Sequence, residues 1–406
     1  MSKYIKFFLY LVLIFTVYAT GSIFLVSHYY NIAVVSLLVT AVIFKLFAPK
    51  SFGIIISSNA FLLLLILTLL ILMIISFNFN GATKYSSYLA ILMQIYASYF
   101  IASSIAFEDF KKIYVNIMTV LALISLFCFA IVLFKPTVML SLPKISGSAS
   151  VDYYNAFVYV FCSAKGFGSF SPFTRNNGIF WEPGAYQAFL NIALLFLLEK
   201  SNVKNRMDSL KLFILIAAIL TTFSTTGYII MFLIIIFRFS DILKIVKVST
   251  LKTIAALFLL TAVVFFISKS EMSGFMSDKL NTEFGEEGNF INRLYLNDFA
   301  ICFEHFKNAL FGISFESYAA RGLKSGNSIV QTMVCTGIPF TLILLAMYSA
   351  FCKKISRHKF LCFIILLMIF STESLLWRPL FLCMAWYGVA STEEINIKYR
   401  IGYKNE

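Results

Sequence analysis

The feature that most constrains the fold is a series of apolar runs, most of them long enough to cross a lipid bilayer. A helix that spans the ~30 Å hydrocarbon core needs about 17 to 25 mostly apolar residues. The chain is 60% hydrophobic and only 13% charged, which leaves too few polar residues to cover a water-soluble surface. We therefore predict an all-α polytopic membrane protein with about twelve transmembrane helices. The predicted runs are 5–26, 31–48, 53–77, 86–107, 113–134, 184–199, 209–223, 227–239, 252–268, 327–351, 359–371 and 375–390.

The distribution of basic residues predicts how these helices are oriented. Most of the 33 lysines and arginines lie in the short segments that an alternating chain places on one side, together with both termini. An excess of basic residues in short loops marks the inner side of a membrane. The net charge of +14 is therefore interpreted as a signal of orientation. Because the charge is spread over these loops, it does not indicate nucleic-acid binding.

Two segments on the outer side are long, and no inner loop approaches their length. Loops of this length in compact proteins are usually functional or disordered. Neither segment is charge-rich or low in aromatic residues, so we expect any chemistry on the outer face. The predicted division is helices one to five (1–134), the first long outer loop (135–183), helices six to nine (184–268), the second long outer loop with an amphipathic helix (269–326), and helices ten to twelve with a cytoplasmic tail (327–406).

Two neighbouring runs, 209–223 and 227–239, are short for a bilayer and are joined only by the segment 224–227. This turn, which begins with Ser224, is expected to lie below the outer surface. Irregular backbone at membrane depth is tolerated where it is buried in protein or lines a wet cavity. The alternative is a pair of short helices in a locally thinned bilayer.

The second outer loop contains a pattern typical of an amphipathic helix between Asn289 and Leu310. Apolar side chains such as Cys302 and Phe306 repeat at helical spacing, and Asn289 suits the N-cap position. Arg293 would then lie in the first turn, where free amide groups already favour an anion. A helix that lies solvated on the membrane surface would show a similar pattern.

The most distinctive charged stretch runs from Thr174 to Tyr186 and leads from the first outer loop into an apolar run. It contains Arg175, Trp181 and Glu182, and Pro183 suits the first turn of the following helix. Ionisable groups at a membrane boundary often mark function. In the alternative interpretation, Trp181 only anchors the interface, while Arg175 and Glu182 are solvated or form an ion pair.

Three outer arginines, Arg175, Arg293 and Arg321, flank predicted membrane entries. Arginine stays charged and binds phosphate oxygens in a bidentate manner. This set therefore favours the anionic headgroup of a lipid-linked substrate. We find no catalytic-serine, zinc-protease, P-loop or dinucleotide-binding motif. We expect no metal and no cofactor.

The stretch from Arg175 to Tyr186, RNNGIFWEPGAY, resembles the R-x-x-G-x-F-x-E-P-G element of O-antigen polymerase and ligase-type proteins. The segment 223–228 resembles the mid-chain S-x-T-G turn of that family. Looser similarities follow at 292–295, at 308–313 and at 326–328, where Asn327 matches a position of the family pattern. The resemblance covers about residues 170 to 345.

This resemblance implies an inverting glycosyltransferase of the C-type membrane architecture, located in the cytoplasmic membrane with its active site on the outer, periplasmic side. Such proteins take a glycan from an undecaprenyl-diphosphate carrier and transfer it to a sugar or lipid acceptor. Carried onto this chain, Arg175 and Arg293 would bind the diphosphate, with Arg321 as a weaker third. Glu182 is the first candidate for the base. The remaining candidates for substrate contacts are Trp181, Ser224 and Asn327.

Gly326 stands where ligase relatives often place a histidine, which favours a polymerase of O-antigen, capsule or exopolysaccharide over a ligase. The expected partners are the undecaprenyl-diphosphate-linked oligosaccharide, membrane lipid, and a chain-length regulator and flippase of the same pathway. An alternative from another class is a polysaccharide flippase or other transporter, which also has about twelve helices. Transporters usually show internal repeats, and we find no convincing repeat in this sequence.

Overall fold

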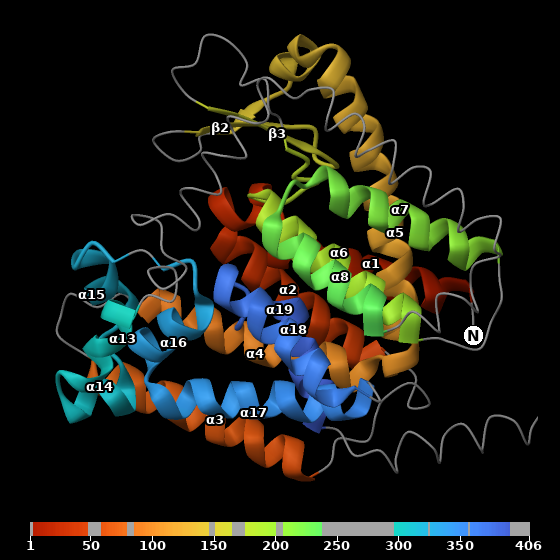
Figure 1. The fold of residues 1–406 in the computed structure, drawn as a ribbon. Coiled ribbons are helices and arrows are strands. Elements are labelled where there is room, and N and C mark those ends of the chain that lie inside the picture. Colours follow the sequence, from red (N-terminus) through yellow and green to blue (C-terminus); the bar gives the residue numbers. More distant parts are fainter. Residues whose placement is uncertain are drawn as a thin grey trace, which may run out of the picture. The chain divides into compact units, whose positions relative to one another are not determined.

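The computed structural model describes residues 3–47, 58–78, 85–145, 151–164, 175–199, 206–237, 296–323, 325–355 and 358–389. Its chain forms two compact units (Figure 1). Unit 1 comprises Met1–Thr20, His28–Ile113 and Arg293–Glu406, and unit 2 comprises Gly21–Ser27 and Tyr114–Asn292. Each unit is described by itself below.

Unit 1 is built from helices. Its core helices are α2, α4, α17 and α19, and Figure 1 shows α17 beside α19, two helices in extensive contact. Every residue of α19 from Pro379 to Gly388 is buried. The helices are α1 (Lys3–Gly21, whose last residue belongs to unit 2), α2 (Tyr30–Phe47), α3 (Ser58–Phe77), α4 (Tyr85–Ser104), α13 (Leu296–Ala300), the 3-10 helix η3 (Ile301–Phe303), α14 (Phe306–Phe311), α15 (Phe315–Ala320), α16 (Ser328–Thr336), α17 (Ile338–Ile355), α18 (Lys359–Thr372) and α19 (Pro379–Val389).

Side-chain hydrogen bonds show the relative direction of helices in unit 1. Near the start of α2, the Tyr30 hydroxyl accepts from Gln94 Nε2 of α4 at 2.8 Å. Near its end, Lys45 Nζ donates to the carbonyl of Ser103 at the end of α4, at 3.1 Å. The two helices therefore run parallel. This is the direction expected for the second and fourth predicted crossings of a chain that crosses the membrane back and forth.

Unit 2 surrounds α6 (Pro183–Glu199), in which every residue from Ala185 to Leu198 is buried. α7 and α8 pack against it. The elements of unit 2 are the π-helix η1 (Phe24–His28), α5 (Phe107–Phe134, which begins in unit 1), the 3-10 helix η2 (Pro136–Ser141), β1 (Lys144–Ile145), β2 (Val151–Asn155), β3 (Val160–Ala164), α6, α7 (Arg206–Thr221) and α8 (Thr225–Phe237).

The segment predicted as the first outer loop contains a small antiparallel sheet in the order β1-β2-β3, which the prediction of an all-α fold did not include. Tyr153 of β2 pairs with Cys162 of β3. The strands carry valine, tyrosine and phenylalanine, residues that suit a half-buried pleated surface. Three short strands are easily missed in a sequence whose hydropathy pattern is dominated by membrane helices.

The helices of both units fit an all-α membrane protein. Within the described ranges, four are long and apolar enough to cross a membrane by length and composition, namely Tyr30–Phe47, Asn59–Phe77, Phe107–Phe134 and Ile338–Ile355. Five shorter apolar helices accompany them. Every predicted run overlaps a helix except 252–268, which lies outside the described residues. The number of twelve crossings stays a prediction.

Two predicted helices are interrupted. The run 327–351 breaks at Gly337, whose φ of +89° is strained for other residues, and where a Cβ atom would collide with the carbonyl of Leu310. The predicted amphipathic helix 289–310 is also wrong as one continuous element. Its described part consists of α13, η3 and α14, separated by Glu304 and the extended His305, and Phe306 of the expected apolar face is 81% exposed.

Candidate functional site

The loop from Arg175 to Glu182 leads into α6 and is held by backbone hydrogen bonds from three sides within unit 2. Asn176 N donates to Thr221 O at the end of α7, at 3.0 Å. Val160 N of β3 donates to Gly178 O at 2.7 Å, and Ile23 N donates to Ile179 O at 3.1 Å. Because these partners are distant in sequence, the conformation of the loop depends on the assembled unit.

The Asn176 side chain fixes the loop from within. This residue is fully buried, and its Nδ2 donates to Ser125 Oγ at 3.1 Å and to Thr221 Oγ1 at 2.9 Å. Its Oδ1 accepts from Gly178 N at 3.0 Å, which closes the turn where Gly178 adopts a φ of +56°. The amide thereby joins the loop to α5 and α7 with both amide hydrogens and its oxygen engaged.

Arg175 is half-buried and points to the turn between α7 and α8. Its Nε donates to Thr222 O and its Nη2 to Phe223 O, both at 3.0 Å. Carbonyls at the end of a helix lack partners within that helix and carry partial negative charge, so a guanidinium there is favourable. Arg175 is therefore held in one orientation, beside a strained turn in which Phe223 has a φ of +48°.

Trp181 and Glu182 lie at the start of α6. Trp181 Nε1 donates to the exposed Glu182 Oε1 at 2.8 Å, and Glu182 O accepts from Tyr186 N at 3.1 Å. The carboxylate thus lies next to an indole at the helix entrance and is open to solvent. The carboxylate binds the Trp181 indole through Oε1, and the alternative of an Arg175–Glu182 ion pair stays a prediction.

The small sheet supplies two side chains that the sequence analysis missed. Burial raises the pKa of the Cys162 thiol to about 11, while the Arg175 charge and a hydrogen bond with Asn177 act in the opposite direction. Burial also raises the pKa of Tyr153 to about 12, assisted by the nearby charges of Cys162 and Glu182. The enrichment of this hairpin in valine, tyrosine and phenylalanine was the sequence signal that could have indicated it.

Ser224 is 7% exposed and precedes α8, where its Oγ accepts from Gly227 N at 3.4 Å. Two polar residues of α6, Gln187 and Asn191, lie next to this turn, and neither has any exposed surface. Asn191 Nδ2 donates to Gln187 Oε1 at 2.9 Å and to Gly227 O at 3.2 Å. The turn between α7 and α8 comprises residues 222–224, so most of the predicted turn 224–227 belongs to α8, and polar side chains lie against it. Its depth below the outer surface stays a prediction.

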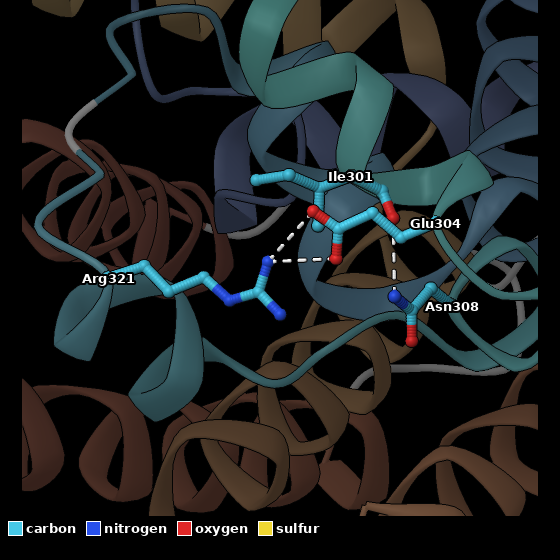
Figure 2. A network of polar contacts seen from close by, with 4 residues as sticks. All are labelled: Ile301, Glu304, Asn308 and Arg321. Carbon is cyan, nitrogen blue, oxygen red and sulfur yellow. Dashed lines mark hydrogen bonds and ion pairs between the residues drawn. The ribbon is translucent and has the colours of Figure 1, made fainter.

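The other predicted site residues belong to unit 1. Arg321 Nη1 lies 3.0 and 3.2 Å from the two carboxylate oxygens of Glu304, and both side chains are more than two-fifths exposed (Figure 2). Asn308 lies beside this pair and donates from Nδ2 to Ile301 O at 3.2 Å. Arg321 therefore forms a surface ion pair, an interaction that usually contributes little to stability.

Asn327 is buried and caps α16, where its Oδ1 accepts from Ile329 N at 3.0 Å and from Val330 N at 3.2 Å. Its amide oxygen is therefore engaged in the fold. Arg293, the third predicted arginine, lies outside the described residues. The structure thus groups Arg175, Trp181, Glu182 and Ser224 in unit 2, and Arg321 and Asn327 in unit 1.

Among the described residues, no three histidine, cysteine, aspartate or glutamate side chains are grouped so that they could hold a metal ion. The side chains available for chemistry in unit 2 are instead the guanidinium of Arg175, the exposed carboxylate of Glu182 and the indole of Trp181. Comparison with known proteins found no matching protein-family model, no matching curated protein and no matching solved structure.

Proposed function

We propose that the protein is an inverting glycosyltransferase that polymerises undecaprenyl-diphosphate-linked oligosaccharide repeat units into O-antigen, capsule or exopolysaccharide at the outer face of the cytoplasmic membrane. The observation that carries the proposal is the Arg175–Glu182 loop. It presents a cation of fixed orientation and an exposed carboxylate where a polar segment enters an apolar helix. A lipid diphosphate with an attached glycan has matching parts, namely an anion, sugar hydroxyls and an apolar chain.

In the proposed reaction, an acceptor hydroxyl oxygen attacks the anomeric carbon of the donor sugar. The bond from that carbon to the diphosphate oxygen breaks, and the electron pair leaves with the lipid diphosphate. Arg175 stabilises the negative charge that develops on this leaving group, together with Arg293. Glu182 accepts the hydroxyl proton, a role that its solvent-accessible position at the start of α6 permits.

The other residues have secondary roles in this proposal. Trp181 holds the Glu182 carboxylate and offers a ring face to a sugar. Ser224 and Asn327 act by shaping α8 and α16 rather than by direct contact, because their polar oxygens serve as helix caps. Arg321 is a weaker third cation, since Glu304 already occupies its guanidinium. A flippase and a chain-length regulator would work with the enzyme before and after this step.

The test is polymer formation by the purified protein in liposomes that contain the lipid-linked repeat unit. Losing charge-assisted bonds of ~1.5–3 kcal/mol in the transition state lowers turnover by about 10- to 150-fold. We expect this loss in Arg175→Ala, and also in Arg175→Lys, because a point charge cannot replace the guanidinium fork. Lys144→Ala is the matched control, since that lysine is exposed and pairs only with Asp152 among the ion pairs of the sheet.

Because Arg175 also binds the carbonyls of Thr222 and Phe223, the melting temperature is measured for each variant. Loss of polymer in a variant that still melts cooperatively supports the proposal. Normal polymer length in both Arg175 variants would exclude a diphosphate-binding role for this residue.

A second candidate function is transport of a lipid-linked glycan. It is favoured by the buried polar pair Gln187 and Asn191, which lies against the junction of the short helices α7 and α8. Interrupted helices with polar groups near the midplane are typical of transporters. The same liposomes distinguish the two functions, because a transporter moves the labelled repeat unit across the bilayer without lengthening it.

A further inference from the structure

A group of polar and aromatic side chains in unit 1 contains none of the candidate site residues described above. It forms where the turn between α18 and α19 meets α2, α4 and α15. We call it the Trp377 cluster. Its members are Tyr30, Gln94, Phe315, Glu316, Trp377 and Arg378.

Contacts connect five of these residues in a continuous series, and Glu316 follows Phe315 in α15. The Arg378 guanidinium carbon lies 4.8 Å from the Trp377 ring centroid and 5.3 Å from that of Tyr30. Trp377 meets Phe315 edge to face, with ring centroids 6.1 Å apart. On the other side, the Tyr30 hydroxyl accepts from Gln94 Nε2 at 2.8 Å. Two aromatic residues of different helices thus flank one guanidinium.

Apart from the Arg378 guanidinium, three polar atoms of the cluster are buried and have no hydrogen-bond partner within the described part of the chain. They are Gln94 Oε1, Glu316 Oε2 and Trp377 Nε1. Gln94 has no exposed surface at all, and Glu316 uses only its other oxygen, which accepts from Ser87 Oγ at 3.3 Å. A buried polar atom without a partner lowers stability, so three of them in one cluster require an explanation.

The chemistry of these atoms selects a class of ligand. Two of them accept hydrogen bonds and one donates. A phosphate accepts only, so it would suit the indole and the buried Arg378 guanidinium but leave both acceptors without partners, next to a carboxylate that repels it. Sugar hydroxyls both donate and accept. A sugar therefore matches the acceptors as well as the donors of the cluster, whereas an anion matches the donors alone.

We propose that the Trp377 cluster is a sugar-binding site, with Gln94, Glu316 and the Trp377 indole as hydrogen-bond partners of the sugar. The identification of this sugar as the acceptor end of the growing glycan rests on the proposed function. The start of α2, which holds Tyr30, and the turn before α19 are ends that the charge pattern predicts on the outer side, where the glycan would be, whereas Gln94 lies midway along α4. Because the three atoms are shielded from solvent, a sugar reaches them by separating Phe315 of α15 from Trp377.

The test compares two tryptophans with opposite hydrogen bonding. The Trp377 indole has no partner in the described chain, whereas Trp386 Nε1 donates to Ile95 O at 3.3 Å. Each is changed to phenylalanine in the full-length protein in lipid nanodiscs. The probe is the repeat-unit oligosaccharide released by mild acid from lipid-linked intermediates of the source cells. Its affinity is measured by calorimetric titration, together with the melting temperature and the binding of inorganic pyrophosphate.

We expect Trp377→Phe to weaken oligosaccharide binding about three- to tenfold while leaving the melting temperature unchanged or higher. Trp386→Phe should do the opposite, lowering the melting temperature and keeping the affinity. Glu316→Gln, which can keep its bond with Ser87, should also weaken oligosaccharide binding. Pyrophosphate binding should be unchanged in all three variants.

The proposal is overturned if the oligosaccharide does not bind, if Trp377→Phe and Trp386→Phe bind it equally well, or if Trp377→Phe weakens pyrophosphate instead. These outcomes are independent of polymer formation. A protein that binds the sugar at this cluster yet makes no polymer would retain the site and refute the proposed function. A protein that makes polymer with unchanged affinity in Trp377→Phe and Glu316→Gln would retain the function and refute the site.

Discussion

Asn176→Ala is expected to destabilise the protein because this amide joins the Arg175–Glu182 loop to two helices of unit 2. The change removes one bond to each of the hydroxyls of Ser125 and Thr221. Both hydroxyls keep other partners, Ala122 O and Ala218 O, so each lost bond costs ~0.5–1.5 kcal/mol.

The change also leaves the buried Gly178 N without its acceptor, the Oδ1 atom of Asn176. An unsatisfied buried amide costs ~1–3 kcal/mol. Adding the three contributions gives a total loss of about 2–6 kcal/mol in the free energy of unfolding. This is well above the typical effect of a point mutation.

The assay is equilibrium unfolding of the purified protein in mixed detergent micelles. Asn155→Ala is the matched control, because the Asn155 Oδ1 accepts a single exposed bond from Phe157 N at 2.7 Å. We expect a loss below about 1 kcal/mol there. If Asn176→Ala loses no more stability than Asn155→Ala, the amide does not anchor the loop and the argument from its hydrogen bonds fails.

Three further predictions concern the carboxylate, the orientation and the sheet. Glu182→Gln should keep the bond from the Trp181 indole yet reduce polymer formation ~10²–10⁴-fold with donor binding intact; near-normal turnover would leave Glu182 as a scaffold. Cysteines placed at Ser148 and Ser277 should react with an impermeant maleimide on intact cells, and labelling only after permeabilisation would reverse the orientation. Since burial raises the pKa of the Cys162 thiol to about 11, its alkylation should accelerate about tenfold per pH unit from pH 8 to 10, in a variant whose other cysteines are alanine. A rate that levels off near pH 9 would contradict burial of this thiol.

The sequence alone determined the class of the protein and the places of most helices. The length and composition of an apolar run are local properties, so runs such as 31–48 and 113–134 agree closely with α2 and α5. The start of α6 could also be predicted from the sequence, because Pro183 is compatible with a first helical turn and incompatible with the middle of a helix. The same local reasoning picked out Arg175 and Glu182 as a charged stretch at a helix entrance.

Tertiary structure decided what those residues contact. Arg175 binds carbonyls 47 and 48 residues away, and the loop around it is held by β3, by α7 and by the residue Ile23. The break between η3 and α14 and the one at Gly337 occur because these segments pack against each other, which outweighs helical periodicity. The Trp377 cluster combines side chains from four elements that are far apart in sequence. A local sequence pattern cannot predict such contacts, since they form only after distant helices have packed together.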